Sequence, residues 1–387
     1  MKARDYMRLA LSLARRGYGC TSPNPMVGAV LVKHGQVLGR GWHHRAGEPH
    51  AEIEALHDAR PDAARGSTLY VTLEPCCTHG RTPPCTDAIL AAGIKRVVVG
   101  ATDPNPHHSG KAFALLRHAG VEVTQGVLAE DCARLNEAFN HWIVHRTPLV
   151  TVKAAMTLDG KIAAASGESK WITGKRARAY GMKLRQGADA ILVGINTILA
   201  DNPALTPRTA PSQTRALKPK RLRRIVLDAY ARTPMSAKVV SDEQAALTTI
   251  VVSKAAPERR IKALAKRVNV VLAPVERSSK RPLAARASSK ANISAATVNI
   301  SWVLKKLGSE DVINLLVEGG GEVNASFLLQ RLAHRIAFFY APKVLGGYGA
   351  GKAVAGDGAK SWDEIIRLDG LKWERLGEDW LLTARCL

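Results

Sequence analysis

The chain has 387 residues, of which 46% are hydrophobic and 23% charged, and its formal net charge is +23. This length suits two domains, and this composition suits a soluble globular protein that buries sizeable cores. No stretch is long and apolar enough to cross a bilayer, so we expect no membrane-spanning segment. Three of the six cysteines fall within ten residues, which in a cytosolic chain suggests metal binding more than disulfides.

The positive charge is uneven along the chain. Residues 208–224 hold seven basic and no acidic side chains, and residues 275–290 hold five basic and one acidic. Both segments are rich in Pro, Ser or Ala and lack apolar periodicity, so we predict loops. Neither interleaves aromatic residues with its charges, as a surface for single-stranded nucleic acid does. We therefore interpret both as solvated loops and predict no nucleic-acid partner.

Helix and strand patterns alternate through the first half. Residues 5–16 predict an amphipathic helix with charges throughout, unlike the apolar block of a secretory signal, so we expect a cytoplasmic protein. The other helices are predicted at 50–60, 85–92, 110–119 and 130–145. The strands are predicted at 26–32, 36–41, 67–73, 96–100 and 121–125, the first two as a hairpin. This alternation predicts an α/β fold with a mixed sheet.

The pattern breaks at Thr147-Pro148. We place a domain boundary there, which gives domains of residues 1–146 and 147–387. The second half alternates again and predicts a second α/β domain. Its strands are predicted at 149–156, 190–193, 224–227, 249–252, 268–272, 313–317, 336–340 and 380–384. Its helices are predicted at 175–186, 261–266 and 322–330.

His50-Ala51-Glu52, followed by Cys76 and Cys85, is the strongest functional signal. One imidazole and two thiolates can hold Zn²⁺ and leave a fourth position for water, as in catalytic zinc sites. Zinc lowers the pKa of such a water to about 7, and Glu52 can carry protons beside it. Because residues i and i+2 do not share a helix face, the metal has to lie over the helix end. A helix beginning at Cys85 favours its thiolate form.

Several neighbouring residues allow more than one interpretation. Cys77 and His79 are alternative ligands, and a structural zinc is the alternative to a catalytic one. Glu74 either faces a substrate or supports the cysteine loop. Asn24, between two prolines, is either a turn residue or a contact to a heterocycle, since an amide offers both a donor and an acceptor.

The cysteine spacing separates two kinds of zinc deaminase. The general signature has Pro-Cys-x-x-Cys, whereas eight residues separate Cys76 from Cys85. The longer spacing resembles the riboflavin-pathway deaminases, as do the segments 23–28, 47–52, 72–76 and 80–85. The resemblance implies a cytidine-deaminase-like α/β/α domain. In this domain it makes His50, Cys76 and Cys85 the zinc ligands. It also makes Glu52 the catalytic proton carrier and Asn24 a contact to the pyrimidine.

Gly319-Gly320-Gly321 lies between a predicted strand and a predicted helix. Backbone amides at a helix N-terminus bind phosphate, so the segment is interpreted as a phosphate loop; the alternative is a tight turn that needs glycine. A Rossmann domain is disfavoured, because Asn324 stands in place of the third glycine and the strand is not the first of its domain.

The second half resembles the reductase domain of the same riboflavin-pathway family, which has a dihydrofolate-reductase-like fold. The segments that carry this resemblance are 153–163, 166–173, 194–208, 318–321 and 341–347. The NADPH contacts that it implies are Ala155, Trp171, Thr197, Asp201, Gly320, Gly321, Glu322, Val323, Asn324, Ala325 and Ser326. The substrate contacts that it implies are Ser169, Arg185, Leu205, Arg208 and Glu318.

The resemblance implies two successive reactions on a small phosphorylated pyrimidine. The first is hydrolytic deamination of 2,5-diamino-6-ribosylamino-4(3H)-pyrimidinone 5′-phosphate. The second is NADPH reduction of the ribosyl unit to a ribityl side chain. Arg185 and Arg208 are candidates to hold the phosphate bidentately, and Lys153 and Asp201 are candidates for proton movement.

Two rival hypotheses stay open at this point. One is a zinc-dependent nucleic-acid base deaminase with an accessory domain, which the net charge favours. The other is a non-catalytic scaffold stabilised by zinc. The sequence also allows a homo-oligomer.

Overall fold

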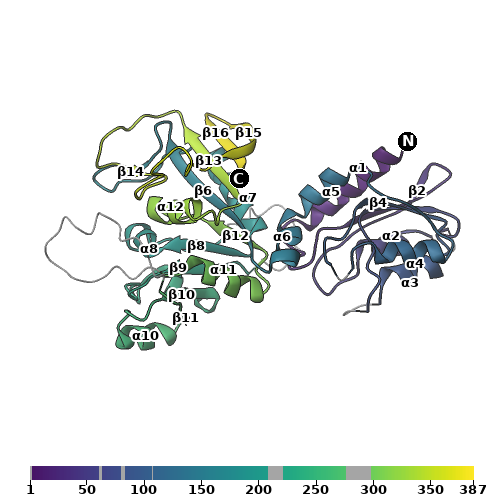
Figure 1. Cartoon of the computed structure of the whole chain (residues 1–387), viewed down its shortest axis with the longest axis horizontal. Coiled ribbons are helices and arrows are strands. Elements are labelled where there is room, and N and C mark those ends of the chain that lie inside the picture. The colour runs from purple at the N-terminus through teal and green to yellow at the C-terminus, as the bar shows by residue number, and fades with distance from the viewer. Residues whose placement is uncertain (1, 61–62, 80–82, 107, 208–220, 276–297) are drawn as a thin grey trace. The chain divides into compact units, whose positions relative to one another are not determined.

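A computed structural model describes residues 2–387 except 61–62, 80–82, 107, 208–220 and 276–297 (Figure 1). The chain divides into two compact units, Met1–Thr147 and Pro148–Leu387. Most of the two basic segments lies outside the described residues, and so does Arg208.

The N-terminal unit is built on a five-stranded mixed sheet with the order β2-β1-β3-β4-β5. β1 pairs antiparallel with β2 and β3, and β3, β4 and β5 run parallel. The predicted hairpin is confirmed. The strands are β1 (Gly28–Lys33), β2 (Gln36–Trp42), β3 (Thr68–Leu73), β4 (Arg96–Ala101) and β5 (Glu122–Thr124).

Helices cover both faces of this sheet, because its central strands alternate between two cores. In β1, Ala29 and Leu31 pack with α2, α3 and α4, and Val30 and Val32 pack with α1 and α5 (Figure 1). Gly41 of β2 lets α2 approach closely, since a Cβ there would lie 2.2 Å from the Ala51 carbonyl oxygen. The helices are α1 (Ala3–Ala14), α2 (Ala51–Asp58), α3 (Cys85–Ala91), α4 (Lys111–His118), α5 (Ala129–Leu135) and α6 (Glu137–His145).

The single helix predicted at 130–145 is wrong, because the chain breaks into α5 and α6 at Asn136. The buried side chain of Asn136 accepts a hydrogen bond from Met26 N at 2.8 Å and donates one to Met26 O at 2.9 Å. This pair of contacts ties the break to the segment before β1, so α6 is oriented independently of α5.

The C-terminal unit is built on a nine-stranded sheet with the order β11-β10-β9-β8-β12-β6-β13-β16-β15. The strands from β11 to β13 run parallel, and β16 and β15 continue antiparallel at one edge. β7 and β14 form a separate pair. The strands are β6 (Leu149–Thr157), β7 (Lys161–Ala163), β8 (Ala190–Gly194), β9 (Arg223–Leu227), β10 (Thr248–Val252), β11 (Asn269–Leu272), β12 (Asn314–Val317), β13 (Arg335–Ala341), β14 (Gly351–Lys352), β15 (Leu368–Leu376) and β16 (Asp379–Cys386).

Both faces of the parallel part are buried, which explains its nearly continuous apolar strands. In β8, Leu192 packs in the core that contains α11 and α12, and Ile191 and Val193 pack in the core that contains α9 and α10. The helices are α7 (Lys175–Gly187), α8 (Ile195–Asp201), α9 (Lys238–Ser241), α10 (Glu258–Ala265), α11 (Ile300–Ser309) and α12 (Gly321–Leu329).

Six elements of the second unit were not predicted, namely β7, α8, α9, α11, β14 and β15. β15 is exposed along almost its whole length, so its residues show no alternation between a buried and a solvent face. α11 does carry the apolar spacing of an amphipathic helix at Ile300, Val303, Leu304 and Leu307.

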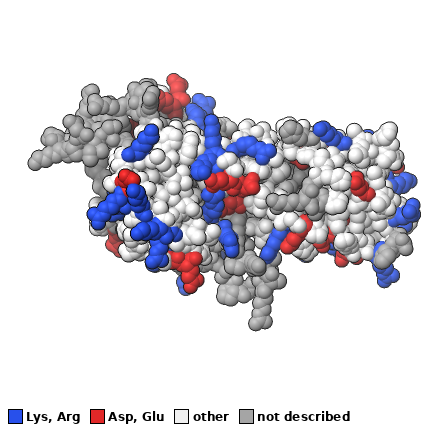
Figure 2. Space-filling view, turned by 90° about the horizontal axis from the view of Figure 1, so that it is seen from below, with Lys and Arg blue, Asp and Glu red and all other residues white. Residues whose placement is uncertain are grey.

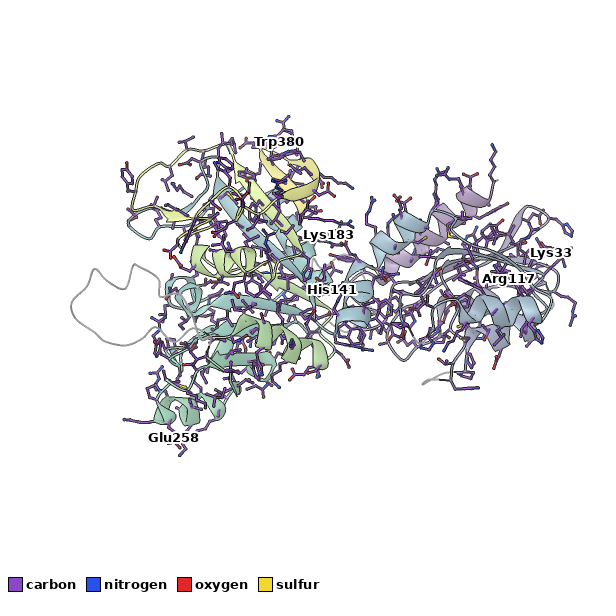
Figure 3. All side chains as sticks on the ribbon, viewed as in Figure 1. Lys33, Arg117, His141, Lys183, Glu258 and Trp380 are labelled. Atoms are coloured by element: carbon purple, nitrogen blue, oxygen red, sulfur yellow. The ribbon has the colours of Figure 1, made fainter. Side chains whose placement is uncertain are left out.

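The described surface carries charged side chains and also exposed large hydrophobic residues, such as Trp362 and Val344. On the described part of the face shown in Figure 2, basic and acidic side chains lie beside one another. Arg117 of α4 and Glu258 of α10 are exposed, and Trp380 of β16 is 44% exposed (Figure 3). None of the helices within the described residues combines the length and the apolarity that a membrane span needs.

Candidate active sites

The first site is a cavity of about 420 Å³ in the N-terminal unit. His50, Glu52 and Cys76 lie in its wall, at the ends of β3 and α2. His50 is the N-cap of α2 in an extended conformation, with φ −77° and ψ 163°. Its side chain therefore leaves from the end of the helix, which overcomes the unfavourable i, i+2 spacing between His50 and Glu52.

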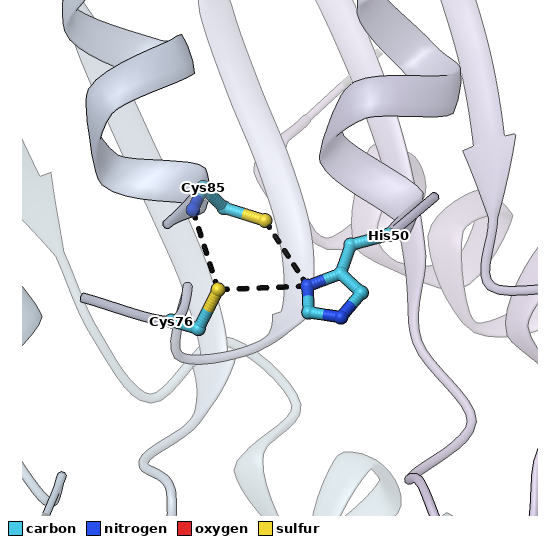
Figure 4. Close-up of side chains that lie close together, drawn as sticks. All are labelled: His50, Cys76 and Cys85. Carbon is cyan, nitrogen blue, oxygen red and sulfur yellow. Dashed lines mark hydrogen bonds between the residues drawn. The ribbon is translucent and has the colours of Figure 1, made fainter. Parts of the chain in front are cut away.

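Three side chains gather their donor atoms at this point (Figure 4). His50 Nδ1 lies 3.2 Å from Cys85 Sγ and 3.5 Å from Cys76 Sγ. Among the described residues, His50, Cys76 and Cys85 form the group that could hold a metal ion, because their ligand atoms all lie within 4.8 Å of one another. The alternative ligands Cys77 and His79 are not in this group.

The cysteines are placed for metal binding by their backbone. Cys76 follows β3, and Cys85 is the first residue of α3. Cys85 N donates to Cys76 Sγ at 3.2 Å. Hydrogen bonding from Cys85, together with His50, lowers the pKa of Cys76 to about 4, despite its burial. Cys76 is therefore a thiolate at neutral pH, which is the form that binds metal.

Glu52 is the buried carboxyl group of this cavity. It is 3% exposed, and burial raises its pKa to about 7. A carboxyl group with a pKa near neutrality can both accept and release a proton during turnover.

Asn24 and His43 form a hydrogen-bonded chain in the same wall. His43 Nδ1 lies 3.0 Å from the Pro49 carbonyl oxygen, and His43 Nε2 lies 3.1 Å from Asn24 Nδ2. Burial lowers the pKa of His43, which favours the neutral ring. Because a carbonyl only accepts, Nδ1 carries the hydrogen and Nε2 accepts from the Asn24 amide. The amide oxygen of Asn24 is thereby left as an acceptor.

Sequence reasoning missed two parts of this cavity. One is an apolar wall of Phe139, Trp142 and Ile143 on α6. Their i, i+3, i+4 spacing marks one helix face, but that spacing does not distinguish a cavity wall from core. The other is the polar pair Asp103 and Asn105 on the loop between β4 and α4, which line the cavity together with His108.

The second site is a cavity of about 490 Å³ in the C-terminal unit. Its lining brings together six of the residues predicted for cofactor or substrate, with Lys153 beside them. These six are Ala155, Trp171, Arg185, Asp201, Leu205 and Glu318. Ser169 donates to Asp201 Oδ1 at 3.5 Å, and Thr197 lies partly buried on α8 without belonging to the lining.

Glu318 is the centre of the charges in this cavity. Arg185 Nε and Nη2 donate to its two oxygens at 2.8 and 2.9 Å, and Lys153 Nζ lies 3.6 Å from Oε2. Burial by itself raises the pKa of Glu318, but Lys153 and Arg185 outweigh it and hold the pKa at about 2. The guanidinium of Arg185 is thus engaged by Glu318, and it is less suited to bind a phosphate than the sequence suggested.

Leu205 sits in this cavity with a left-handed backbone, φ 55°, although such values are rare for a non-glycine residue. Arg224 Nη1 donates to the Ala204 carbonyl at 3.0 Å, and Arg185 Nη1 donates to the Thr206 carbonyl at 3.2 Å. Two arginines therefore hold the carbonyl groups of the two residues that flank Leu205. Arg224 is fully buried and also pairs with Asp242.

The glycine segment begins α12, with Gly320 as its N-cap. A Cβ on Gly321 would lie 2.2 Å from the Lys352 carbonyl oxygen, so this glycine is required for packing. A Cβ on Gly320 meets nothing within 4 Å. The open side at Gly320, next to first-turn amides without intrahelical partners, fits a phosphate group of a dinucleotide.

Two residues predicted from this segment as NADPH contacts have buried side chains. Asn324 is fully buried and donates to the Ala353 carbonyl at 2.8 Å, and Ala325 is 3% exposed. Their side chains lie in the protein interior. Glu322, Val323 and Ser326 are exposed or partly exposed.

Comparison with known proteins covers both units. Residues 148–382 match the model of the RibD C-terminal domain, and residues 1–101 match that of the cytidine and deoxycytidylate deaminase zinc-binding region. The riboflavin biosynthesis protein RibD of Aquifex aeolicus is 44% identical over 376 residues, which cover 97% of this chain and 96% of the relative. The chain belongs to the RibD family.

Solved RibD structures have the same fold over their whole length. Acinetobacter baumannii RibD superposes with a TM-score of 0.84 at 33% identity, covering 100% of this chain and 99% of the other. The diaminohydroxyphosphoribosylaminopyrimidine deaminase/5-amino-6-(5-phosphoribosylamino)uracil reductase of Thermotoga maritima has a TM-score of 0.78 at 32% identity, covering 100% and 99%. The expected fold is confirmed: a cytidine-deaminase-like domain followed by a dihydrofolate-reductase-like domain.

Membership of the RibD family makes this chain a bifunctional enzyme of riboflavin biosynthesis, a deaminase and a reductase in one polypeptide. Its cofactors are zinc and NADPH. The nitrogen and two sulfur atoms at His50, Cys76 and Cys85 fit Zn²⁺, and the open backbone at Gly320 fits the nucleotide. A nucleic-acid base deaminase is not favoured, because it leaves the second unit unexplained.

Proposed function

We propose that residues 1–146 deaminate 2,5-diamino-6-ribosylamino-4(3H)-pyrimidinone 5′-phosphate and that residues 147–387 reduce the ribosyl unit of the product with NADPH. The observation that carries the first half is the group of three ligand atoms within 4.8 Å of one another, in a cavity that also contains the buried Glu52. The predicted cytoplasmic location and oligomeric state stay predictions.

In the deaminase site, His50, Cys76 and Cys85 hold zinc, whose contribution is an activated water. Glu52 accepts a proton at its carboxylate and delivers protons to the ring nitrogen and the leaving amine. The amide oxygen of Asn24 accepts a hydrogen bond from an N–H group of the pyrimidine, while its amide nitrogen donates one of its two hydrogens to His43. Phe139 and Trp142 provide the apolar wall against which the ring lies.

In the reductase site, NADPH supplies the hydride, and the protein orients the cofactor and the sugar. Gly320, Gly321 and Trp171 would hold the cofactor, and Ala155, Thr197 and Asp201 would be further contacts. Ser169, Leu205 and Glu318 contact the substrate, and Arg208, outside the described residues, is assigned to its phosphate. Arg185 keeps Glu318 ionised and in place.

The test is one assay of the purified, zinc-loaded chain with the diaminopyrimidine phosphate, with and without NADPH. We expect ammonia release without NADPH, and NADPH oxidation only after deamination. Ammonia release from RNA, with none from the free phosphorylated pyrimidine, would overturn the proposed substrate. Loss of deamination on metal removal, with the unit still folded, excludes a zinc-stabilised scaffold.

A further inference from the structure

Glu74 is a buried carboxylate between the metal-ligand segment and the loop that follows β4. It is 5% exposed, stands two residues before Cys76, and lines the cavity that contains His50. Within the described residues it has no ion-pair partner. A carboxylate buried without a cation is costly, so its charge has to be stabilised by hydrogen bonds.

Three backbone N–H groups provide those hydrogen bonds. Glu74 Oε1 accepts from Ala112 N at 3.1 Å, and Oε2 accepts from Gly110 N at 3.0 Å and Asp103 N at 3.2 Å. Gly110 is the N-cap of α4, and Ala112 lies in its first turn, where amide hydrogens have no partner within the helix. One carboxylate thus fixes both ends of the β4–α4 loop.

The loop that Glu74 holds carries the polar side of the deaminase cavity. Asp103, Asn105 and His108 all line it. Asp103 Oδ1 accepts a hydrogen bond from Asn105 N at 2.9 Å, which holds the Asp103 side chain against the backbone of Asn105. His108 Nδ1 lies 3.4 Å from Thr78 Oγ1, in the metal-ligand segment. A small displacement of the loop moves a carboxylate and an imidazole relative to Glu52.

We propose that Glu74 is a positioning residue of the deaminase, which ties the Cys76 segment to the β4–α4 loop and so places Asp103 for binding of the aminopyrimidine. Both of its oxygens are used by backbone N–H groups, so Glu74 acts through the loop. The inference rests on the proposed function only for the identity of the substrate.

The kinetic test compares zinc-loaded wild type with Glu74→Gln in the full chain. Glutamine has the same size but a single acceptor oxygen, so at least one of the three N–H groups loses its partner. We expect the KM for the diaminopyrimidine phosphate to rise about tenfold, the effect of one lost charge-assisted hydrogen bond. The kcat, the zinc content and the reductase activity of the same molecule stay near wild type.

A double variant distinguishes positioning from a separate structural defect. Asp103→Asn replaces the carboxylate that the β4–α4 loop places in the cavity with a neutral amide. If Glu74 acts through Asp103, the double variant Glu74→Gln/Asp103→Asn raises KM no more than the larger of the two single changes. The proposal is overturned if Glu74→Gln leaves KM unchanged or loses its zinc. It is also overturned if the KM increases of the two single variants multiply in the double variant.

A measurement without substrate separates failure of this inference from failure of the proposed function. Amide hydrogen exchange of Asp103, Gly110 and Ala112 is expected to accelerate in Glu74→Gln, while β3 keeps its protection. Unchanged exchange at these amides contradicts the inference, whatever the substrate is. A wild-type chain that does not deaminate the diaminopyrimidine phosphate contradicts the proposed function, and the exchange result still decides the role of Glu74.

Discussion

Two glutamates, one in each cavity, have opposite pKa shifts. Glu52 is buried in the deaminase cavity, and burial raises its pKa to about 7. The Glu318 side chain is 12% exposed, but Lys153 and Arg185 outweigh its partial burial and hold its pKa at about 2. The same side chain is therefore a proton carrier in one unit and a permanent charge in the other, and neighbouring cations decide which.

Glu52→Gln tests the first half of this comparison and has the largest expected effect. Glutamine keeps the shape but cannot carry a proton, so we expect the kcat of deamination to fall by about 10²–10⁴-fold. Steady-state assays of ammonia release measure this. The reductase activity on the deaminated substrate is the internal control, and retained deamination removes Glu52 from the proton path.

Arg185→Met tests the second half by leaving Glu318 without its bidentate partner. Lys153 Nζ stays 3.6 Å from Glu318 Oε2 and still compensates part of the charge, so we expect the loss of the Arg185 hydrogen bonds to cost about 1.5–3 kcal/mol in the free energy of unfolding of the C-terminal unit. Denaturant unfolding measures it. A change below about 1 kcal/mol contradicts the role given to this pair.

The pH dependence of stability follows from the lowered pKa of Glu318. Since its folded-state pKa lies near 2 and its ordinary value is 4.5, its carboxylate stabilises the fold above pH 4.5. The contribution, about 3 kcal/mol, is lost as the pH falls from 4.5 toward 2. Glu318→Gln is expected to unfold with a shallower pH dependence in this window than wild type. Identical slopes argue against the assigned shift.

Gly320→Ala and Gly321→Ala form a matched pair with smaller effects. At Gly321 a Cβ meets the Lys352 carbonyl oxygen at 2.2 Å, so we expect destabilisation of about 1–3 kcal/mol. At Gly320 the space is open, so stability stays near wild type and the KM for NADPH rises. Thermal unfolding and NADPH titration separate the two, and the reverse pattern contradicts a nucleotide at Gly320.

The sequence was most informative where a motif and a local turn coincide. His50, Glu52, Cys76 and Cys85 could be predicted because strand ends and helix starts bring them together. The loop residues Asp103 and Asn105 and the wall on α6 could not, because long-range hydrogen bonds from Glu74 and Asn136 place them. The pairing of Glu318 with Arg185 could not be predicted either, because it joins residues that are 133 positions apart, and it changes the role expected for that arginine.

The arrangement of His50, Cys76 and Cys85 is tested most directly by anomalous X-ray diffraction at the zinc edge on crystals of the full chain. We predict one peak in the N-terminal unit, bonded to His50 Nδ1 and the two Sγ atoms, with a further position open toward Glu52. No peak there, or a disulfide joining Cys76 to Cys85, contradicts the account.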